Sequence, residues 1–400
     1  MPKAPKRPSR KAATDSKTPR RPSPKELAAM TNKQVGEDLV IPASEIKDMK
    51  IVRYPTGLLT LDSALAGGFP ASTFNIISGL ESAGKDALLN CVIRTHQRLY
   101  KEKSHVLYCY TEPGGYDKHW ARKQGVSVCL SEYDIRSLEA GHGRPFPTEY
   151  RMKLGEQIGT FNFIESKDML KVLKAILFNA NHGCPLIILN SAEGIGLDKY
   201  IDNDEMEQGS HGLQKAAIWT QFSEKWGLRG GNRWPGTLLI TRQARANLHT
   251  YGWRAKAWTS KHGSHMVRHF MSMGVELTGL EKITRGSGSS EEVVGKKVKW
   301  DLIKGKHGAH EGVKGECKLY HATGVDAVDD LLEGLLDAGL ARLNFDKSKI
   351  IIDHDGEKLE GSRADLASKI RMDTDLFMSL YKEGIKALRI PILYFPLEDS

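Results

Sequence analysis

The strongest constraint on the fold is the glycine-rich stretch GLESAGK at residues 79–85, which fits the pattern GxxxxGK. An apolar run, Thr73–Ser78, precedes it, and a helical pattern over Ala87–Tyr100 follows it. Glycines in such a turn let backbone N–H groups face a phosphate, and the N-terminus of the next helix adds positive potential. The stretch alone could be an ordinary glycine turn, but its strand–turn–helix setting predicts a nucleotide phosphate site. The residues expected to line this site are Gly79, Glu81, Ser82, Ala83, Gly84, Lys85 and Asp86.

The residue after the loop lysine departs from the usual pattern. A phosphate-binding loop of this type normally continues with Ser or Thr, whose hydroxyl binds Mg²⁺, whereas this chain has Asp86. The apolar strand Leu186–Asn190 ends in Asn190, where an Asp metal ligand is typical. Compared with the usual pattern, the loop gains an acidic residue at Asp86 and the strand loses one at Asn190. We expect either that Asp86 and Asn190 hold Mg²⁺ with their chemistry exchanged, or that the metal site is degenerate.

Apolar strand-like runs alternate with amphipathic helical stretches over the roughly 260 residues after Met49. This alternation predicts βαβ units and a mostly parallel sheet. The predicted strands are Thr73–Ser78, Val106–Tyr110, Phe161–Glu165, Leu186–Asn190 and Thr237–Thr241, and the predicted helices are Ala87–Tyr100, Asp168–Asn181 and Gln214–Trp226.

The 400 residues, of which 40% are apolar, suffice for two or three domains. Residues 1–25 carry six prolines among basic and polar residues, so we expect a disordered basic tail. Residues 26–50 would form an oligomerisation or linker segment, with a helix over Lys25–Gln34 and an extended Asp38–Ile41. Residues 51–315 would form the main α/β core. Residues 316–400 would form a small α/β lobe, with helices near Val325–Ala338, Ser362–Ile370 and Asp373–Ala387.

Two basic pieces outweigh a mildly acidic remainder and give the chain its net charge of +9. The tail has nine Lys and Arg against one acid, Asp15, and the stretch Arg242–Phe270 has six Lys and Arg, four His and no acid. Such pieces are typical of a protein that binds a polyanion, although each alone could be a solvated face. No apolar run approaches the ~18–20 residues of a membrane helix, and no secretory signal is evident. Five cysteines without a CxxC pair favour a reducing compartment, so we expect a cytoplasmic protein.

Taken in order, these motifs resemble the RecA family of strand-exchange recombinases, in a divergent form like those of large bacteriophages. The resemblance covers roughly residues 50–390. Thr56–Leu65 is similar to the lead-in to the family's phosphate loop, Gly79–Lys85 to the loop itself, and Gly356–Gly361 to part of the C-terminal lobe. The resemblance implies a RecA-like P-loop ATPase core with a mostly parallel sheet, a small α/β C-terminal lobe, and ATP with Mg²⁺ as cofactors.

The resemblance also implies catalytic residues. Glu112, after the strand Val106–Tyr110, would activate the attacking water, and Gln243 would sense the terminal phosphate. Lys304 and Lys306 would reach the ATP of the neighbouring subunit in a filament. A lone glutamate after a strand is usually a solvated strand end, and a lone KxK is usually surface charge. The joint order and spacing of these residues carry the assignment.

Asp117 and Trp120 match residues that frame the adenine in the family. Trp120 stands where the family has Tyr, and one extra residue precedes Asp117. Residues 130–160 form an insertion to which the sequence assigns no role. The last residues of the sequence, Leu397–Ser400, do not resemble the long acidic tail of bacterial relatives.

Two loops would touch DNA if the resemblance holds. The first, about Asp202–Leu213, is acidic and would position the strand rather than grip it. The second, about Arg245–His265, mixes cations for phosphates with aromatic faces for bases, as in sequence-independent binding of single strands. Its tryptophans could instead be core residues, but no apolar period runs through the segment. The expected DNA-binding residues are Arg245, Tyr251, Trp253, Arg254, Lys256, Trp258 and Lys261.

Together with these features, the resemblance implies an ATP-dependent recombinase that forms a homo-oligomeric filament on single-stranded DNA and pairs it with double-stranded DNA. Recombination mediators or single-strand-binding proteins would be further partners, and the host cytoplasm would be the location if a phage encodes the chain. A non-hydrolysing RecA-like DNA-coating or scaffold protein is the alternative, favoured by Asp86 and Asn190. A hexameric helicase with the same core is a weaker third reading, because the C-terminal lobe resembles that of recombinases.

Overall fold

The computed structural model describes residues 22–36, 40, 51–111, 115–197, 211–229, 236–246, 258–259, 269–286 and 290–388. The chain divides into two compact units, Met1–Lys50 and Ile51–Ser400. In the first unit, helix α1 (Pro24–Val35) begins with a capping box between Ser23 and Glu26 and ends at Gly36. The predicted helix over Lys25–Gln34 is therefore confirmed, while residues 1–21 and all of Asp38–Ile41 except Val40 lie outside the described residues.

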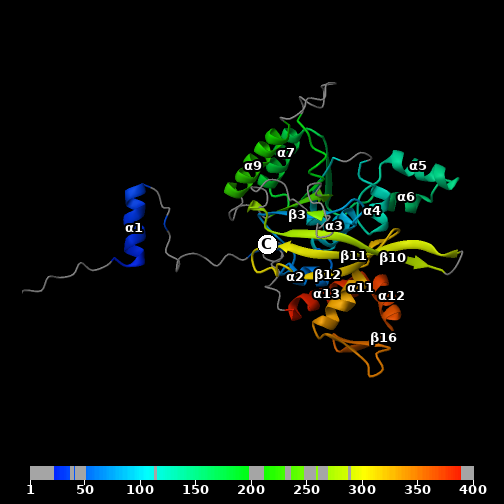
Figure 1. The fold of residues 1–400 in the computed structure, drawn as a ribbon. Coiled ribbons are helices and arrows are strands. Elements are labelled where there is room, and N and C mark those ends of the chain that lie inside the picture. Colours follow the sequence, from blue (N-terminus) through cyan, green and yellow to red (C-terminus); the bar gives the residue numbers. More distant parts are fainter. Residues whose placement is uncertain are drawn as a thin grey trace, which may run out of the picture. The chain divides into compact units, whose positions relative to one another are not determined.

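A nine-stranded sheet organises the second unit (Figure 1). Six neighbouring strands run parallel, and three more continue the sheet in antiparallel order beyond β10. In spatial order the strands are β13 (Gly324–Val325), β12 (Lys314–Tyr320), β11 (Glu292–Lys304), β10 (Gly274–Arg285), β3 (Phe74–Gly79), β7 (Thr237–Gln243), β6 (Leu186–Asn190), β4 (His105–Tyr110) and β5 (Thr160–Glu165).

Helices cover both faces of the parallel strands, which is why these strands read as continuous apolar runs. Helix α3 (Lys85–Tyr100) packs on one face, and α7 (Met169–Asn181) and α9 (His211–Arg229) pack on the other (Figure 1). The alternation of side chains along β6 shows the division: Leu186 and Ile188 join the α3 cluster, whereas Ile187 and Leu189 join the α7–α9 cluster.

The insertion at residues 130–160 forms a pair of helices, α5 (Glu132–His142) and α6 (Thr148–Gly155). The insertion has a small apolar cluster separate from the main core, formed by Leu130, Ile135 and Leu154. Arg122, on helix α4 (Lys118–Lys123), donates to the carbonyl of Lys153 at 2.8 Å and to that of Val128 at 2.6 Å. The insertion is thereby fastened to α4, which carries the predicted adenine-framing Trp120. The remaining short elements of the core are β1 (Arg53–Tyr54), α2 (Leu59–Ala64), β2 (Phe69–Pro70), η2 (Lys101–Lys103), β8 (Arg245–Ala246) and β9 (Trp258–Thr259).

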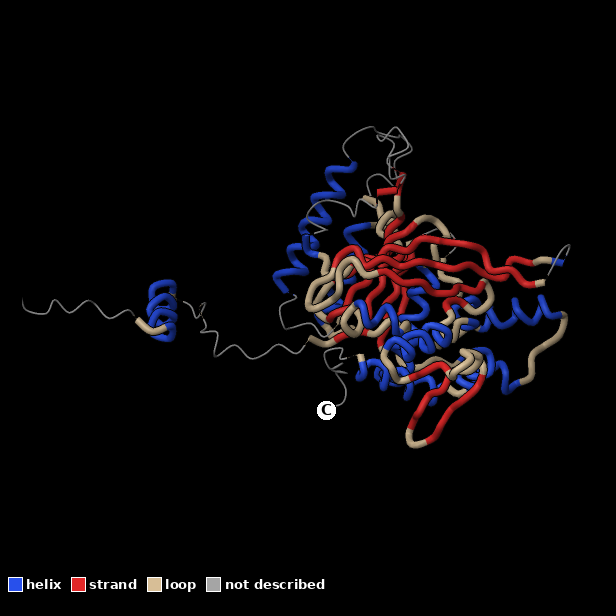
Figure 2. Tube along the Cα trace, turned by 60° about the horizontal axis from the view of Figure 1, so that its bottom comes forward, coloured by secondary structure: helices blue, strands red, loops and turns tan. Residues whose placement is uncertain are grey.

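A three-stranded antiparallel sheet and three helices form the C-terminal part (Figure 2). Its elements are α11 (Ala327–Asp337), β14 (Ala341–Leu343), β15 (Ile350–His354), β16 (Glu357–Gly361), α12 (Arg363–Met372) and α13 (Thr374–Ala387). The predicted boundary between residues 315 and 316 falls inside β12, because β12 and β13 still belong to the large sheet.

Buried carboxyls join the C-terminal helices to α2. Asp62 accepts hydrogen bonds from the backbone of Thr56 at 2.8 Å and from the hydroxyl of Tyr381 on α13. Asp330 on α11 accepts from the backbone N–H of Thr60 at 3.2 Å and from the Thr60 hydroxyl. Burial raises the pKa of Asp62 to about 6 and that of Asp330 to about 7.

The chain is thus an α/β protein with a large mixed, mostly parallel sheet and a small antiparallel C-terminal sheet. The predicted α/β class and mostly parallel sheet are confirmed. Strands β10, β11 and β12 were not predicted. Much of β10 is exposed and charged, so the apolar run that identifies the central strands is missing there. Among the described residues, none of the helices combines the length and the apolar character that a membrane crossing requires.

Candidate functional site

The glycine-rich loop lies where the sequence predicted it, between the end of β3 at Gly79 and the start of α3 at Lys85. Two of its glycines are closely packed, Gly79 against backbone and Gly84 against the end of a leucine side chain. A Cβ at Gly79 would lie 2.6 Å from the carbonyl oxygen of Leu277, and one at Gly84 would lie 2.7 Å from Leu319 Cδ1. Gly84 also has a φ of 101°, which favours glycine. Close packing against β10 and β12 therefore fixes the path of the loop.

Lys85 folds back over this loop. Its side chain is 8% exposed, and its Nζ donates to the carbonyl oxygens of Gly79 at 3.1 Å and Leu80 at 2.8 Å. The ammonium group therefore lies against the loop backbone at the N-terminus of α3, where backbone N–H groups make the potential positive. Around it the loop residues differ in exposure: Glu81 and Ser82 are exposed, and Ala83 is buried.

Asp86 and Asn190, the predicted metal ligands, lie in direct contact although 104 positions separate them. The amide nitrogen of Asn190 donates to Asp86 Oδ1 at 2.9 Å and to the hydroxyl oxygen of Tyr108 at 2.9 Å. The amide oxygen of Asn190 accepts from the hydroxyl of Thr241 at 2.5 Å. Asn190 therefore presents its nitrogen, not its oxygen, to the carboxylate of Asp86. The hydrogen bond from Asn190 therefore helps to orient the carboxylate of Asp86.

Gln243 ends β7 and is exposed. It is paired in register with Gly79 on β3, and the next residue, Ala244, donates its backbone N–H to the carbonyl of Gly79 at 2.9 Å. The carboxyl ends of parallel strands meet at one edge of a sheet. Gln243 therefore stands beside the glycine-rich loop, and its role toward a phosphate stays a prediction.

Glu112, the predicted base, lies outside the described residues, as do Pro113 and Gly114. The chain leading to it is well fixed. The Thr111 hydroxyl donates to the carbonyl of Ser191 at 2.7 Å and accepts from the Ser191 N–H at 2.9 Å. The strand before Glu112 thus ends next to β6, at the same edge as Asn190.

The predicted adenine-framing pair lies at the start of α4. Asp117 caps this helix by accepting from the backbone N–H of Trp120 at 2.8 Å, which is a structural role. The indole N–H of Trp120 donates to the carbonyl of His321 at 2.8 Å, just after β12. The ring of Trp120 is partly buried against the core. The pair is therefore held together and fixed to the large sheet.

Lys304 and Lys306 lie toward the other end of the central strands. Lys304 pairs with Gly274 at the start of β10, whereas Gly79 pairs with Leu277 further along that strand. The Nζ atoms of both lysines donate to the carbonyl of His269, at 3.3 Å and 3.2 Å. Among the described residues, the structure does not bring the two lysines to the glycine-rich loop of their own chain.

Most of the predicted DNA-binding residues lie outside the residues that the structure describes. Arg245 and Trp258 belong to β8 and β9, which pair antiparallel, so a short ribbon closes the base of the second predicted loop. Their side chains are not described, and Tyr251, Trp253, Arg254, Lys256 and Lys261 lie in segments outside the described residues, as does most of the first loop.

Sequence reasoning missed two residues at the site and a third that supports the predicted lysine pair. Tyr108 and Thr241 orient Asn190, and only the alignment of β4, β6 and β7 brings them together. Arg53, which is 2% exposed, donates to the carbonyl of Leu65 at 2.7 Å and to that of His307, and so fixes the turn after Lys306. A single Arg or Thr in a strand carries no sequence signal for such a role.

Compared with models of known protein families, the chain matches none of them.

Proposed function

We propose that the chain is an ATP-dependent DNA recombinase with a RecA-like P-loop ATPase core, which forms filaments on single-stranded DNA and pairs it with homologous duplex. One observation carries the proposal. The glycine-rich loop, Asp86, Asn190 and Gln243 come together at the carboxyl edge of the parallel strands, where α/β proteins of this kind bind ligands.

The loop would bind the phosphates of ATP through its backbone N–H groups and Lys85. Lys85 is already desolvated, so it loses little hydration when a phosphate replaces the carbonyl oxygens that it now contacts. Glu112 would accept a proton from the attacking water, and Gln243, beside the loop, would respond to the terminal phosphate. Lys85, together with Lys304 and Lys306 from the neighbouring protomer, would stabilise the charge that develops on the transferred phosphoryl group.

Asp86 fits Mg²⁺, because this ion commonly uses one or two carboxylates together with phosphate oxygens and waters. The Asn190 amide, which donates to Asp86 at 2.9 Å, would hold that carboxylate in place. The ion would neutralise part of the charge on the phosphates.

The lysine pair supports an ATP site shared between protomers. Lys304 pairs with Gly274 at the start of β10. The loop end of β3, at Gly79, pairs with Leu277 further along β10, so the lysine lies away from the loop. A lysine pair that cannot serve its own loop can serve that of the next copy if protomers stack head to tail. Such heterologous contacts generate open helical filaments when the rotation between protomers does not close into a ring, and the proposed filament is of this kind.

The second predicted DNA-binding loop, about Arg245–His265 and here called the DNA segment, begins two residues after Gln243. Arg245 is also the first residue of the β8–β9 ribbon at the base of this segment. A change at Gln243 on ATP binding would therefore pass to the DNA segment through one intervening residue. This short connection supports the coupling of nucleotide to DNA binding that a recombinase requires.

ATP hydrolysis measured with and without single-stranded DNA tests the proposal. We expect stimulation by DNA in the wild type and loss of hydrolysis in Lys85→Ala. Lys103→Ala, an exposed lysine after α3, is a suitable control and should hydrolyse ATP normally. Hydrolysis that ignores both DNA and Lys85→Ala would overturn the assignment.

A non-hydrolysing DNA-coating or scaffold protein is the second candidate. The orientation of Asn190 favours it, since the oxygen that could replace an Asp ligand accepts from Thr241 instead. This candidate predicts nucleotide binding that Lys85→Ala abolishes, with no hydrolysis under any condition. The same assay, together with a nucleotide-binding measurement, separates the two.

A further inference from the structure

Lys296 reaches the glycine-rich loop from a different part of the sheet. It lies on β11, and its Nζ donates to the carbonyl oxygen of Ser82 in the middle of the loop. Between β11 and the loop strand β3 lies β10, which has a glycine, Gly279, along the path of this side chain. A Cβ at Gly279 would lie 4.0 Å from the Lys296 Cδ. The lysine stem therefore crosses β10 where no side chain stands in its way.

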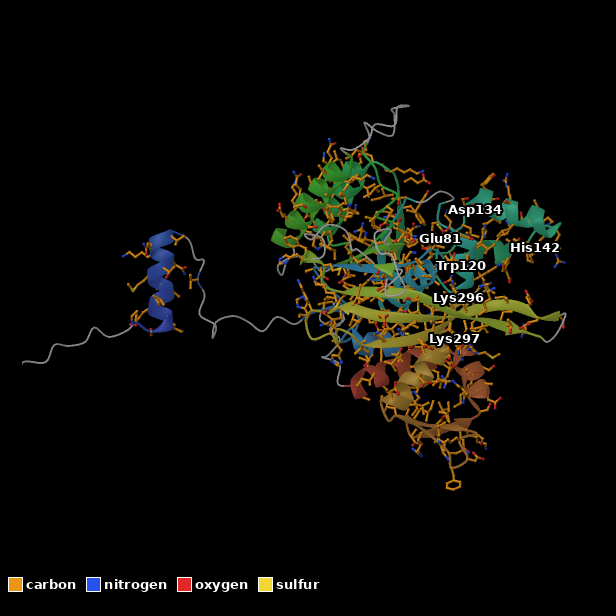
Figure 3. All side chains as sticks on the ribbon, viewed as in Figure 1. Glu81, Trp120, Asp134, His142, Lys296 and Lys297 are labelled. Atoms are coloured by element: carbon orange, nitrogen blue, oxygen red, sulfur yellow. The ribbon has the colours of Figure 1, made fainter. Side chains whose placement is uncertain are left out.

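The next residue, Lys297, provides a natural comparison. Successive side chains of a strand point to opposite faces, so Lys296 and Lys297 diverge. Lys297 forms an ion pair with Glu281 on β10. Figure 3 shows Lys296 on the side of β11 toward Glu81 and Trp120, and Lys297 on the side toward the C-terminal helices.

The charge of the loop explains why a second cation is useful there. Residues 79–86 contain two acids, Glu81 and Asp86, and one cation, Lys85. The replacement of the usual hydroxyl residue by Asp86 thus leaves a phosphate-binding loop with a net negative charge. Lys296 returns the local formal charge to zero. Partial burial lowers the pKa of Lys296, which is consistent with an ammonium group that is partly desolvated beside the loop.

We infer that Lys296 is a second phosphate-binding lysine of the nucleotide site, acting on the phosphates that ADP and ATP share. The inference rests on the proposed function. Asp86 and Asn190, expected at the metal, and Gln243, expected at the terminal phosphate, lie on the β7–β6 side of β3, whereas Lys296 comes from the β10–β11 side. Lys296 therefore flanks the part of the nucleotide away from the reacting bond. It compensates for the charge of Asp86.

Dissociation constants of Mg²⁺–ATP and Mg²⁺–ADP, measured by calorimetry, test this inference on the full chain. We expect Lys296→Ala to weaken both nucleotides by about tenfold and by equal factors, as loss of a charge-assisted contact does. Lys296→Arg should retain most of the affinity. Lys297→Ala, which removes the same charge one position away, should bind both nucleotides as the wild type does.

The salt dependence of ADP binding gives a second readout that a purely structural role would not change. It should become shallower in Lys296→Ala and stay unchanged in Lys297→Ala. Wild-type affinity in Lys296→Ala, or the same loss in both alanine variants, would overturn the role of Lys296 while leaving the nucleotide site intact. If the wild type binds neither nucleotide, or if Lys85→Ala binds as tightly as the wild type, both this inference and the proposed function fail.

Discussion

The contact between Asp86 and Asn190 predicts a specific pattern of mutational coupling. Asn190→Asp would place a second carboxylate where an amide nitrogen now donates to Asp86 at 2.9 Å. The introduced group can still accept from Thr241, and the hydroxyl of Tyr108 can turn to donate to it. The variant should therefore fold, with the unfavourable interaction confined to Asp86.

The size of this effect follows from the geometry. Two unit charges ~4 Å apart repel by ~4 kcal/mol at an effective dielectric constant of ~20. The added carboxylate would repel the bound phosphates in the same way, and because Asp86 is exposed, screening reduces the value to an expected loss of ~1–2 kcal/mol, or about 5- to 30-fold in nucleotide affinity. Asp86→Thr removes the carboxylate expected at Mg²⁺ and should cost a similar amount. The double variant restores a hydroxyl facing a carboxylate, so it should recover much of the loss, with a coupling energy of ~0.5–3 kcal/mol.

The assay is a titration of Mg²⁺-dependent ATP binding and hydrolysis in the four proteins of this cycle, with thermal unfolding as a check on folding. Additive effects of the two substitutions would show that Asp86 and Asn190 do not act on one ion. A wild type that is indifferent to Mg²⁺ would favour the scaffold alternative.

Four further outcomes are expected. Glu112→Gln should suppress ATP hydrolysis and spare nucleotide binding, and a wild-type rate would refute its assignment as the base. Replacing Trp253 and Trp258 with Ala should weaken single-strand binding by ~2–6 kcal/mol in sum, measured by anisotropy of a labelled oligonucleotide; unchanged affinity would place the DNA elsewhere. Deleting residues 1–25 should lower DNA affinity at low salt without altering basal hydrolysis, whereas equal binding would favour a targeting role. Burial raises the pKa of Asp330 to about 7, so its protonated form stabilises the fold fully below pH ~4, and this contribution is lost as the pH rises through ~7. Asp330→Asn should therefore lose less unfolding free energy over that pH range in urea titrations, and a pH profile equal to that of the wild type would contradict this.

The central strands were predictable because helices bury both of their faces. The predicted Thr73–Ser78 and the observed β3 (Phe74–Gly79) differ by one residue at each end, and the predicted Leu186–Asn190 is β6 itself. The exposed ribbon of β10 and β11 was not predicted, since its pairing depends on long-range register and on few apolar residues.

The candidate site was predictable as a set of positions but not as a set of interactions. The sequence pointed to Asp86 and Asn190 through their departures from a known pattern. It could not show that Thr241 takes the amide oxygen of Asn190, because that contact depends on how β6 and β7 align. The same limit applies to Lys296, whose sequence setting, GKKVK, is that of ordinary surface charge.

A complementation assay tests most directly the proposal that ATP binds between protomers. Lys85→Ala lacks the loop lysine, and a variant with Lys304→Ala and Lys306→Ala lacks the lysine pair. Each alone should hydrolyse little ATP in the presence of single-stranded DNA. Random mixing in equal amounts should restore about a quarter of wild-type activity, because about one head-to-tail interface in four then joins an intact loop to an intact lysine pair. A mixture no more active than its separate components would contradict an ATP site built between protomers.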